Sequence, residues 1–191
     1  MVSYNILKDF KVLTDAVAEP VDLNTAKKWL RVEFTQDDEL ISSIIKSVRL
    51  RLEKITGLSF GYKSMTALYE VCNCNEWIEL PYGPVDVIDS VEERTSASTW
   101  DALTETTELI PADYELFGTD SKIKLNANGY FRFTYQGGFS ELPEDLVSDM
   151  KTLIAWYYEN RGHVMKGEQV NSDVFPAEHL LNSQKYRKIV I

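Results

Sequence analysis

The hydrophobic pattern of the chain changes its period twice, and this change limits the folds that are open to it. Between residues 40 and 55, apolar side chains recur every three or four residues, as on one face of an amphipathic helix. From about residue 63 the segments become short and rich in β-branched and aromatic residues, and after residue 143 the helical spacing returns. The order of helices, strands and helix predicts an α+β fold with an antiparallel sheet.

Two helices are predicted before the strands. Asp22 or Asn24 can cap a short helix that runs to about Val32, and Thr35 can cap a longer helix that Gly57 ends. The longer helix has an acidic first turn and basic last turns, which complement the helix dipole. The basic residues are Lys46, Arg49, Arg51 and Lys54. Residues 22–56 are therefore predicted to form a helical hairpin.

Turn residues divide the middle of the chain into strands. Strands are predicted at 64–72, 76–80, 85–94, 112–117, 121–125 and 130–136. Pro81-Tyr82-Gly83-Pro84 separates two of them, and Asn128-Gly129 provides a tight turn before the last. The polar stretch 95–111 is predicted to be an exposed loop or the tip of a long hairpin. Pro143 is predicted to begin a helix that ends near Gly162.

These elements predict a single domain with extensions at both ends. The chain has 191 residues, which is the usual size of one domain. We expect an N-terminal arm over 1–20 and one domain over 21–181, made of the helices in 22–56, a β region over 63–138 and the helix 143–162. Residues 182–191 then form an extended C-terminal tail. The N-terminus lacks the layout of a signal peptide, and no apolar run approaches the roughly 18–20 residues of a membrane span, so we expect no membrane partner.

The charge of the chain is concentrated in its middle. Twenty basic and thirty acidic residues give a net charge of −10. Residues 70–120 hold thirteen acidic residues and one basic residue, Arg94, so that this stretch carries −12 and the rest carries +2. Proteins that grip DNA neutralise phosphates with lysine and arginine, so the acidic middle disfavours a duplex-gripping surface.

No motif in the sequence indicates catalysis or a cofactor. The chain contains neither a phosphate-binding glycine loop nor the motifs HExxH and GxSxG. Cys72 and Cys74 could meet His163 and His179 around zinc, but this spacing matches no common zinc site. We therefore predict no enzyme activity, no metal and no cofactor.

The helical hairpin leaves one competing interpretation open, a DNA-binding regulator. Lys46, Arg49, Arg51 and Lys54 would then contact DNA. Recognition helices, however, usually read bases from their N-terminal half, and here that half is acidic. An unrecognised hydrolase is a still weaker alternative.

The order of short motifs resembles that of the head–tail connector (adaptor, or head-completion) proteins of tailed bacteriophages. The opening motifs are VDLNTAKKWLRV at 21–32, DDELI at 37–41 and LEKITG at 52–57. They are followed by LPYGPV at 80–85, FTYQGGF at 133–139, LPEDL at 142–146 and WYYENR at 156–161. Leu180-Leu181 and Tyr186-Arg187 stand where the family ends. The resemblance covers residues 21–187, and the arm, the 95–111 stretch and the extra residues before Tyr186 depart from it.

The resemblance implies a structural role in the virion. Connectors of this kind form a ring, usually twelvefold, between the portal protein and the next neck or tail component (a stopper or tail terminator). The ring extends the DNA channel and completes the head, and the genome passes through it without specific binding. The protein would lie at the head–tail interface of the virion, and in the host cytoplasm during assembly. In relatives the C-terminal segment reaches the portal, which here indicates Leu180, Leu181, Tyr186, Arg187 and Lys188 as docking residues.

The acidic middle of the chain suggests a second hypothesis. If Glu92 and Glu93 face the channel, their charge repels DNA and lets it pass without sticking. The alternative is that these acids lie outside the ring and serve only solubility.

Overall fold

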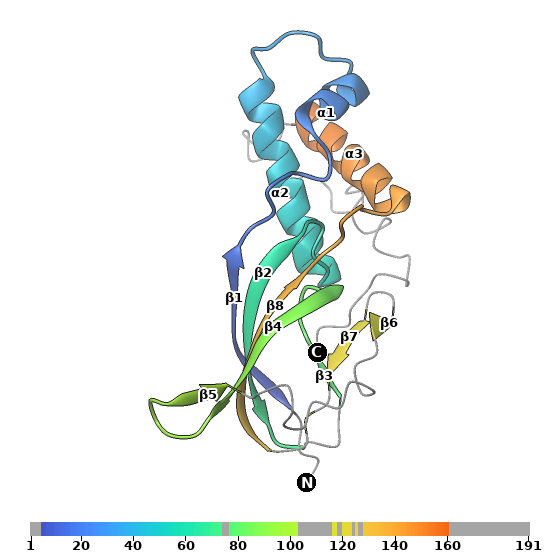
Figure 1. Ribbon diagram of the computed structural model, residues 1–191. Coiled ribbons are helices and arrows are strands. Elements are labelled where there is room, and N and C mark those ends of the chain that lie inside the picture. Colours follow the sequence, from blue (N-terminus) through green and yellow to red (C-terminus); the bar gives the residue numbers. More distant parts are fainter. Residues whose placement is uncertain are drawn as a thin grey trace. The chain divides into compact units, whose positions relative to one another are not determined.

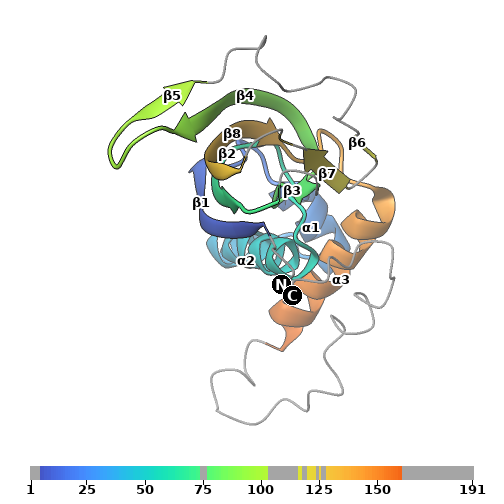
Figure 2. The ribbon, with the colours of Figure 1, turned by 90° about the horizontal axis from the view of Figure 1, so that it is seen from below.

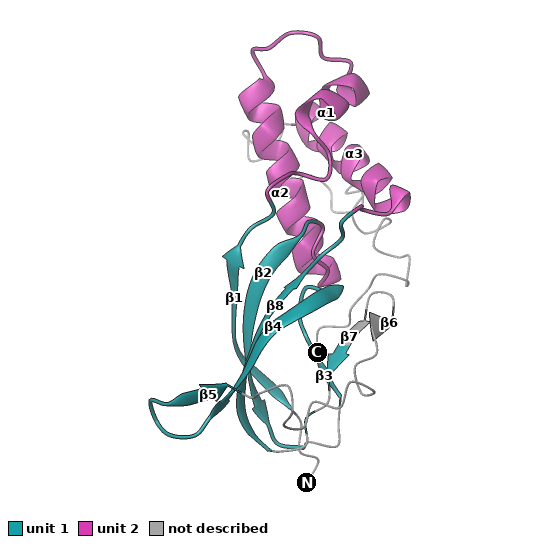
Figure 3. Cartoon of the chain, in the orientation of Figure 1, with its two compact units in different colours: residues 1–16, 61–140 teal, residues 17–60, 141–191 magenta. Residues whose placement is uncertain are grey.

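The computed structural model of the chain describes residues 5–73, 77–102, 116–117, 120–123, 125 and 128–160. Helices and an antiparallel sheet make up these residues, so the fold is α+β, as predicted. The chain divides into two compact units, a sheet unit (residues 1–16 and 61–140) and a helical unit (residues 17–60 and 141–191), shown in Figure 3. The single domain over 21–181 stays a prediction.

The helical unit contains α1 (Leu23–Leu30), α2 (Asp38–Thr56) and α3 (Glu144–Glu159), labelled in Figure 1. Helix α2 packs against α3, and α1 contacts both. The side chains between them are apolar and at most 5% exposed: Ala26, Ile41, Ile45, Val48, Leu52, Leu146, Met150, Leu153 and Ile154. The three-to-four-residue period of α2 is thus explained by one buried face.

The ends of α1 follow the capping rules that the sequence suggested. Asp22 is the N-cap, and its carboxylate accepts hydrogen bonds from the backbone N–H of Thr25 (2.9 Å) and from the Thr25 hydroxyl (2.7 Å). These bonds, the hydroxyl bond first, lower the pKa of Asp22. Arg31 ends α1 in the left-handed conformation, with φ 57°. Asp22, rather than Asn24, therefore begins this helix.

The start of α2 differs from the prediction, whereas its end does not. Thr35 is not the cap, because the helix begins at Asp38, and the Thr35 carbonyl accepts the Asp38 N–H in a preceding turn (3.1 Å). The ammonium of Lys27 holds this turn by binding the Phe34 carbonyl (2.7 Å) and the Asp38 carboxylate (2.5 Å). Gly57 ends α2 at φ 69°, a conformation that glycine adopts without strain.

The sheet unit is built on a five-stranded antiparallel sheet. Its order is β1 (Ile6–Thr14), β2 (Lys63–Val71), β8 (Gly129–Gly137), β4 (Val85–Arg94) and β5 (Trp100–Ala102). Side chains alternate between buried and half-buried along β2 and β8. The sheet therefore has an inner face with Met65, Tyr69, Phe131, Phe133 and Tyr135, and an outer polar face.

A small second sheet completes this unit. It has the order β3 (Ile78–Glu79), β7 (Asp120–Ile123) and β6 (Leu116–Phe117). Figure 2 shows the five-stranded sheet curling around β3. Ile78, Leu80, Ile123 and Leu125 join the inner face in one apolar core.

The strands β1 and β5 lie in segments where no strand was predicted. Residues 6–14, expected to belong to an N-terminal arm, form the edge strand β1 and pair with β2. Every side chain of β1 is exposed except that of Phe10, which stacks on Tyr82 with ring centroids 5.0 Å apart. The 95–111 stretch begins as a hairpin tip, because β5 pairs with β4. Residues 103–111 lie outside the described residues.

Candidate functional site

Glu92 and Glu93 lie near the end of β4 and belong to opposite faces of the sheet. Glu92 is paired across the strands with Arg132, whereas Glu93 is paired with Phe131. Directly opposed residues share a face, and Phe131 is buried on the inner face. Glu93 therefore lies on the inner-face side and Glu92 on the outer side, so the two carboxylates do not form one acidic patch.

The outer side of this hairpin carries an arginine–aromatic cluster that the sequence did not reveal. The guanidinium of Arg132 lies 4.0 Å from the centre of the Trp100 ring and 3.0 Å from the Glu92 carboxylate. Arg94 lies 5.9 Å from the centre of the same ring and 5.8 Å from that of Tyr130. Distances below about 6 Å allow cation–π attraction, so these contacts hold β5 on β4. Glu92 thus carries a charge that Arg132 already balances.

A hydrogen-bonded chain continues across the outer face toward β1. The Tyr130 hydroxyl donates to Glu70 (2.9 Å), and the Lys8 ammonium binds the same carboxylate (2.6 Å). The bond from Lys8, and then that from Tyr130, lowers the pKa of Glu70. The same bonds raise the pKa of Lys8 and of Tyr130. The outer face therefore presents mutually neutralising charges rather than a field of one sign.

Two of the motifs that carried the resemblance pack against each other. The Gly138 N–H donates to the Pro84 carbonyl (2.7 Å), which joins the glycine pair to the LPYGPV segment. A Cβ atom on Gly137 would lie 2.4 Å from that same carbonyl oxygen and 3.0 Å from the Cα of Val85. Only glycine leaves room for this approach. The two motifs are therefore parts of one structural junction.

Buried tyrosines hold the other end of that junction. The Tyr135 hydroxyl donates to the Pro81 carbonyl (2.7 Å), and the Tyr69 hydroxyl donates to the Glu79 carbonyl (2.6 Å). Burial raises the pKa of both tyrosines, and the nearby Glu79 charge raises that of Tyr69 further. Both hydroxyls are thus held neutral as donors. LPYGPV is a structural segment that the sheet core fixes from two sides.

Glu53 of the motif LEKITG belongs to a buried ion cluster near the end of α2. Arg49 is 1% exposed; its Nε lies 2.7 Å and its Nη2 3.2 Å from the two carboxylate oxygens of Glu19. Its Nη1 lies 3.3 Å from Glu53, which also accepts the Phe60 N–H (2.9 Å). Thr56 accepts the Leu58 N–H through its hydroxyl oxygen (3.2 Å). Arg49 and Glu53 therefore fix the chain that leaves α2.

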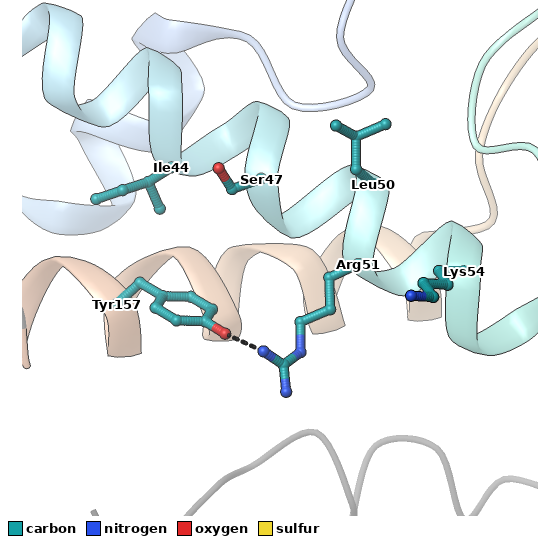
Figure 4. A pocket seen from close by; sticks show the side chains of 6 residues that line it. All are labelled: Ile44, Ser47, Leu50, Arg51, Lys54 and Tyr157. Atoms are coloured by element: carbon teal, nitrogen blue, oxygen red, sulfur yellow. Dashed lines mark hydrogen bonds between the residues drawn. The ribbon is translucent and has the colours of Figure 1, made fainter. Parts of the chain in front are cut away.

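This cluster bears on the DNA-binding interpretation. Of the four basic residues on α2, Arg49 is buried and paired with carboxylates, so it cannot contact DNA. Arg51 donates to the Tyr157 hydroxyl of α3 (3.0 Å). Figure 4 shows this pair with the side chains around it. Together they line an open groove of about 520 Å³, to which Ile44, Ser47, Leu50 and Lys54 also contribute.

The remaining predicted residues give no further site. Leu180, Leu181, Tyr186, Arg187 and Lys188 lie outside the described residues, as do Cys74, His163 and His179. Within the described part of the chain, no three histidine, cysteine or acidic residues are grouped so as to hold a metal ion. None of the helices described here is long and apolar enough to span a membrane.

Comparison with known families finds a match that covers about two-fifths of the chain. Residues 20–95 match the model of the phage gp6-like head–tail connector protein family. The resemblance to head–tail connectors is confirmed. The matched stretch includes α1, α2, β2, β3 and β4, and so the LPYGPV segment and the Arg49–Glu53 pair of the ion cluster, whereas Glu19 lies just before it. No curated protein sequence matches the chain.

Solved structures extend the likeness of this connector-like chain beyond residue 95. A chain of the virion of a native gene transfer agent (GTA) particle is 16% identical, with a TM-score of 0.71 over 95% of this chain and 96% of that chain. A chain in the neck of an empty GTA particle, computed with C6 symmetry, is also 16% identical, with a TM-score of 0.63 over 80% and 84%. The neck of a native GTA particle, computed with C12 symmetry, gives 0.62 at the same identity and coverage. At such identity the likeness shows a shared fold.

Proposed function

We propose that this protein is a non-enzymatic structural component of a phage-like virion, forming a ring in the neck between the portal and the tail. The observation that carries the proposal is the match of residues 20–95 to the head–tail connector family. The fold supports it, because chains of GTA virions and necks share it over most of their length. Two local arrangements also support it, because three of the connector motifs take part in them: LPYGPV packs against the glycine pair of FTYQGGF, and Glu53 of LEKITG belongs to the buried ion cluster.

The proposal includes a set of partners and surfaces. Copies of the chain form a ring, which we take to be twelvefold, on the portal protein, and the next neck or tail component (a stopper or tail terminator) binds its other side. The ring extends the DNA channel, and DNA passes without specific binding. The hairpin 22–56 and the C-terminal helix form its helical part, and an extended tail with Leu180, Leu181, Tyr186, Arg187 and Lys188 docks on the portal. The protein is assembled in the host cytoplasm and remains at the head–tail interface.

The positions of Glu92 and Glu93 sharpen the proposed role of acidic residues in the channel. The two carboxylates belong to opposite faces of the sheet, and both follow Val91, the last buried residue of β4, so a channel would have to pass the end of this hairpin rather than the core. We favour Glu93 as the residue that repels DNA there, because Glu92 is paired with Arg132. Glu93→Lys should then slow DNA ejection, whereas Glu92→Lys should not. Equal ejection rates in both variants and the unmodified particle would contradict a channel role for either residue.

The competing function is that of a DNA-binding regulator. One of the four DNA contacts proposed for it is not available, because Arg49 is buried. A gel shift at low and moderate salt separates the two functions, because a regulator retards DNA in a salt-dependent manner and a connector does not.

Reconstitution with heads tests the proposal itself. Heads assembled without this protein should lose DNA to added nuclease and bind no tails. Adding the purified full chain should protect the DNA and restore tail attachment. Heads that remain open and tailless with saturating protein would reject the proposal.

A further inference from the structure

The five-stranded sheet has two edges along which, among the described residues, no strand is paired. One is the outer edge of β1, a nine-residue strand bonded only to β2. The other is the side of β4 away from β8 over residues 86–91, because β5 covers only Glu92, Glu93 and Arg94. A strand edge presents backbone donors and acceptors that can pair with another chain.

The exposed apolar side chains of β1 distinguish its edge from edges that are protected against pairing with another chain. Soluble proteins usually guard long edges with charges, bulges or short strands. Strand β1 has two bulges and two lysines, yet four of its large apolar side chains are more than two-fifths exposed. They are Ile6, Leu7, Val12 and Leu13. On the β4 edge, Val87 is 45% exposed.

The directions of the strands let these two edges meet in a ring. Every neighbouring pair in β1-β2-β8-β4 is antiparallel, so β1 and β4 run in opposite directions. A second copy placed beside the first in the same orientation therefore brings its β1 antiparallel to β4 of the first. All copies then point the same way, as a ring with two different ends requires, and the contact is heterologous and can close.

The charges on the two edges are complementary in the same arrangement. Lys8 and Lys11 on β1 are exposed, as are Asp86 and Asp89 on β4, and each pair is three residues apart. One antiparallel register places Lys11 opposite Asp86 and also Lys8 opposite Asp89. These groups have partners within their own chain: Glu70 for Lys8, Asp9 for Lys11, Tyr62 for Asp86 and Gln136 for Asp89. New pairs at the surface thus select partner and register more than they add affinity.

We propose that copies of this chain join edge to edge, with β1 of one copy adding to residues 86–91 of β4 in the next, so that one β-sheet continues from subunit to subunit. The partner is a second copy of the chain, and the mode is strand addition. The inference rests on the ring of the proposed function and assigns its subunit contact.

Charge reversal with rescue tests this contact. The variants are Lys11→Glu, Asp86→Lys and the two combined, and the readout is the amount of full-length protein that sediments with DNA-filled, tailless heads. Each single reversal places like charges opposite each other and should reduce bound protein by about tenfold. The combination restores opposite charges at every contact and should return binding to within about twofold of the unmodified protein. Tyr62→Phe is the matched control, because it removes the hydrogen bond to Asp86 without changing an edge charge, and it should bind normally.

The outcomes separate the two proposals. Single reversals that bind normally, or a combination that stays as defective as the singles while its unfolding temperature is unchanged, would overturn the edge contact and leave the ring standing. Failure of the unmodified protein to bind heads would reject the proposed function, and the edge contact with it.

Disulfide trapping supplies an independent geometric test. Opposed residues in an antiparallel pair have Cα atoms about 4.5–5.5 Å apart, within reach of a disulfide. In a chain with Cys72 and Cys74 replaced by serine, Lys11→Cys combined with Asp86→Cys should give a ladder of cross-linked copies on assembled heads under oxidation, whereas Lys46→Cys combined with Asp86→Cys should not. Lys46 is exposed on α2, outside both edges. Equal ladders in both variants, or none in the first, would contradict the contact.

Discussion

One arginine–carboxylate pair in the helical unit is buried, whereas one in the sheet unit is open to water. In the helical unit, Arg49 and Glu53 are almost fully buried, with side chains 1% and 2% exposed, and form ion pairs. On the outer face of the sheet unit, Arg132 and Glu92 form a pair of similar length with side chains 38% and 30% exposed. The same chemical groups thus occupy a dry and a wet setting.

This difference determines what each cluster can do. A buried charge that loses its partner keeps the full cost of its desolvation, whereas water replaces a lost partner at the surface. The helical cluster must therefore stay intact for the fold. The exposed charges on the outer face of the sheet can be exchanged with little effect on folding, which leaves them available for contacts with other molecules.

The largest expected effect is that of breaking the buried cluster. Arg49→Met leaves Glu53 buried without its cation, and we expect a loss of about 3–5 kcal/mol in the free energy of unfolding. Denaturant unfolding followed by circular dichroism measures it. Arg49→Met combined with Glu53→Gln should recover part of the loss, because no unpaired buried charge remains. A loss below about 1 kcal/mol in the single variant would show that the cluster behaves like a surface pair.

A smaller loss is expected from the buried junction of the sheet unit. In Gly137→Ala the new methyl group meets the Pro84 carbonyl oxygen at 2.4 Å, so the backbone must move. Overpacking of this kind costs about 1–3 kcal/mol. Thr66→Ala, on the half-buried outer face of the same sheet, is the matched control and should change the free energy of unfolding by less. Equal stability of Gly137→Ala and the unmodified protein would contradict the close approach of Gly137 to the Pro84 carbonyl.

Replacing the Asp149 carboxylate on α3 by a neutral group is expected to stabilise the protein. Partial burial, and then the charge of Asp145, raises the pKa of this carboxyl. When folding raises the pKa of a carboxyl, its protonated form stabilises the folded state below the unfolded pKa of 3.8. This stabilisation is lost as the pH rises through the folded pKa. Asp149→Asn should therefore raise the unfolding temperature at pH 7 by about 1–2 °C, and not at pH 3. An unchanged or lower unfolding temperature at pH 7 would contradict the burial argument.

The smallest change in stability is expected for a substitution of Glu70 on the outer face. The pH dependence of this change is opposite in sign to that for Asp149. Hydrogen bonds from Lys8 and Tyr130 lower the pKa of this carboxyl. The stabilisation that the ionised Glu70 contributes is present above the unfolded pKa of 4.5 and is lost as the pH falls through the folded pKa. Glu70→Gln should thus be slightly less stable than the unmodified protein at pH 7 and equal to it in strong acid. Thermal unfolding across pH measures this, and a difference that grows below pH 4.5 would reverse the assigned sign.

The sequence was sufficient for elements whose apolar residues follow one period. Helix α2 and strands β2 and β8 bury one face each, so their spacing predicted them. Strand β1 could not be found in this way, because its apolar side chains are exposed and do not alternate. Thr35 was the wrong cap, since the lysine that holds the preceding turn comes from α1.

The candidate site was harder to predict than the fold. The sequence suggests Glu92 and Glu93 as one acidic pair, but alternation along a strand places neighbours on opposite faces. The four-residue spacing of Arg49 and Glu53 was a visible signal of an ion pair, whereas Glu19, thirty residues away from Arg49, gave none. The stacking of Arg132 on Trp100 depends on pairing between strands that are distant in sequence.

Imaging of the head vertex shows directly whether this protein forms a ring on the portal. Purified protein is mixed with DNA-filled, tailless heads from the same source, and the portal vertex is examined by electron microscopy without imposed symmetry. We expect an added ring beneath the portal, built from repeated copies of this fold and open along its axis. A bare portal vertex at saturating protein would contradict it.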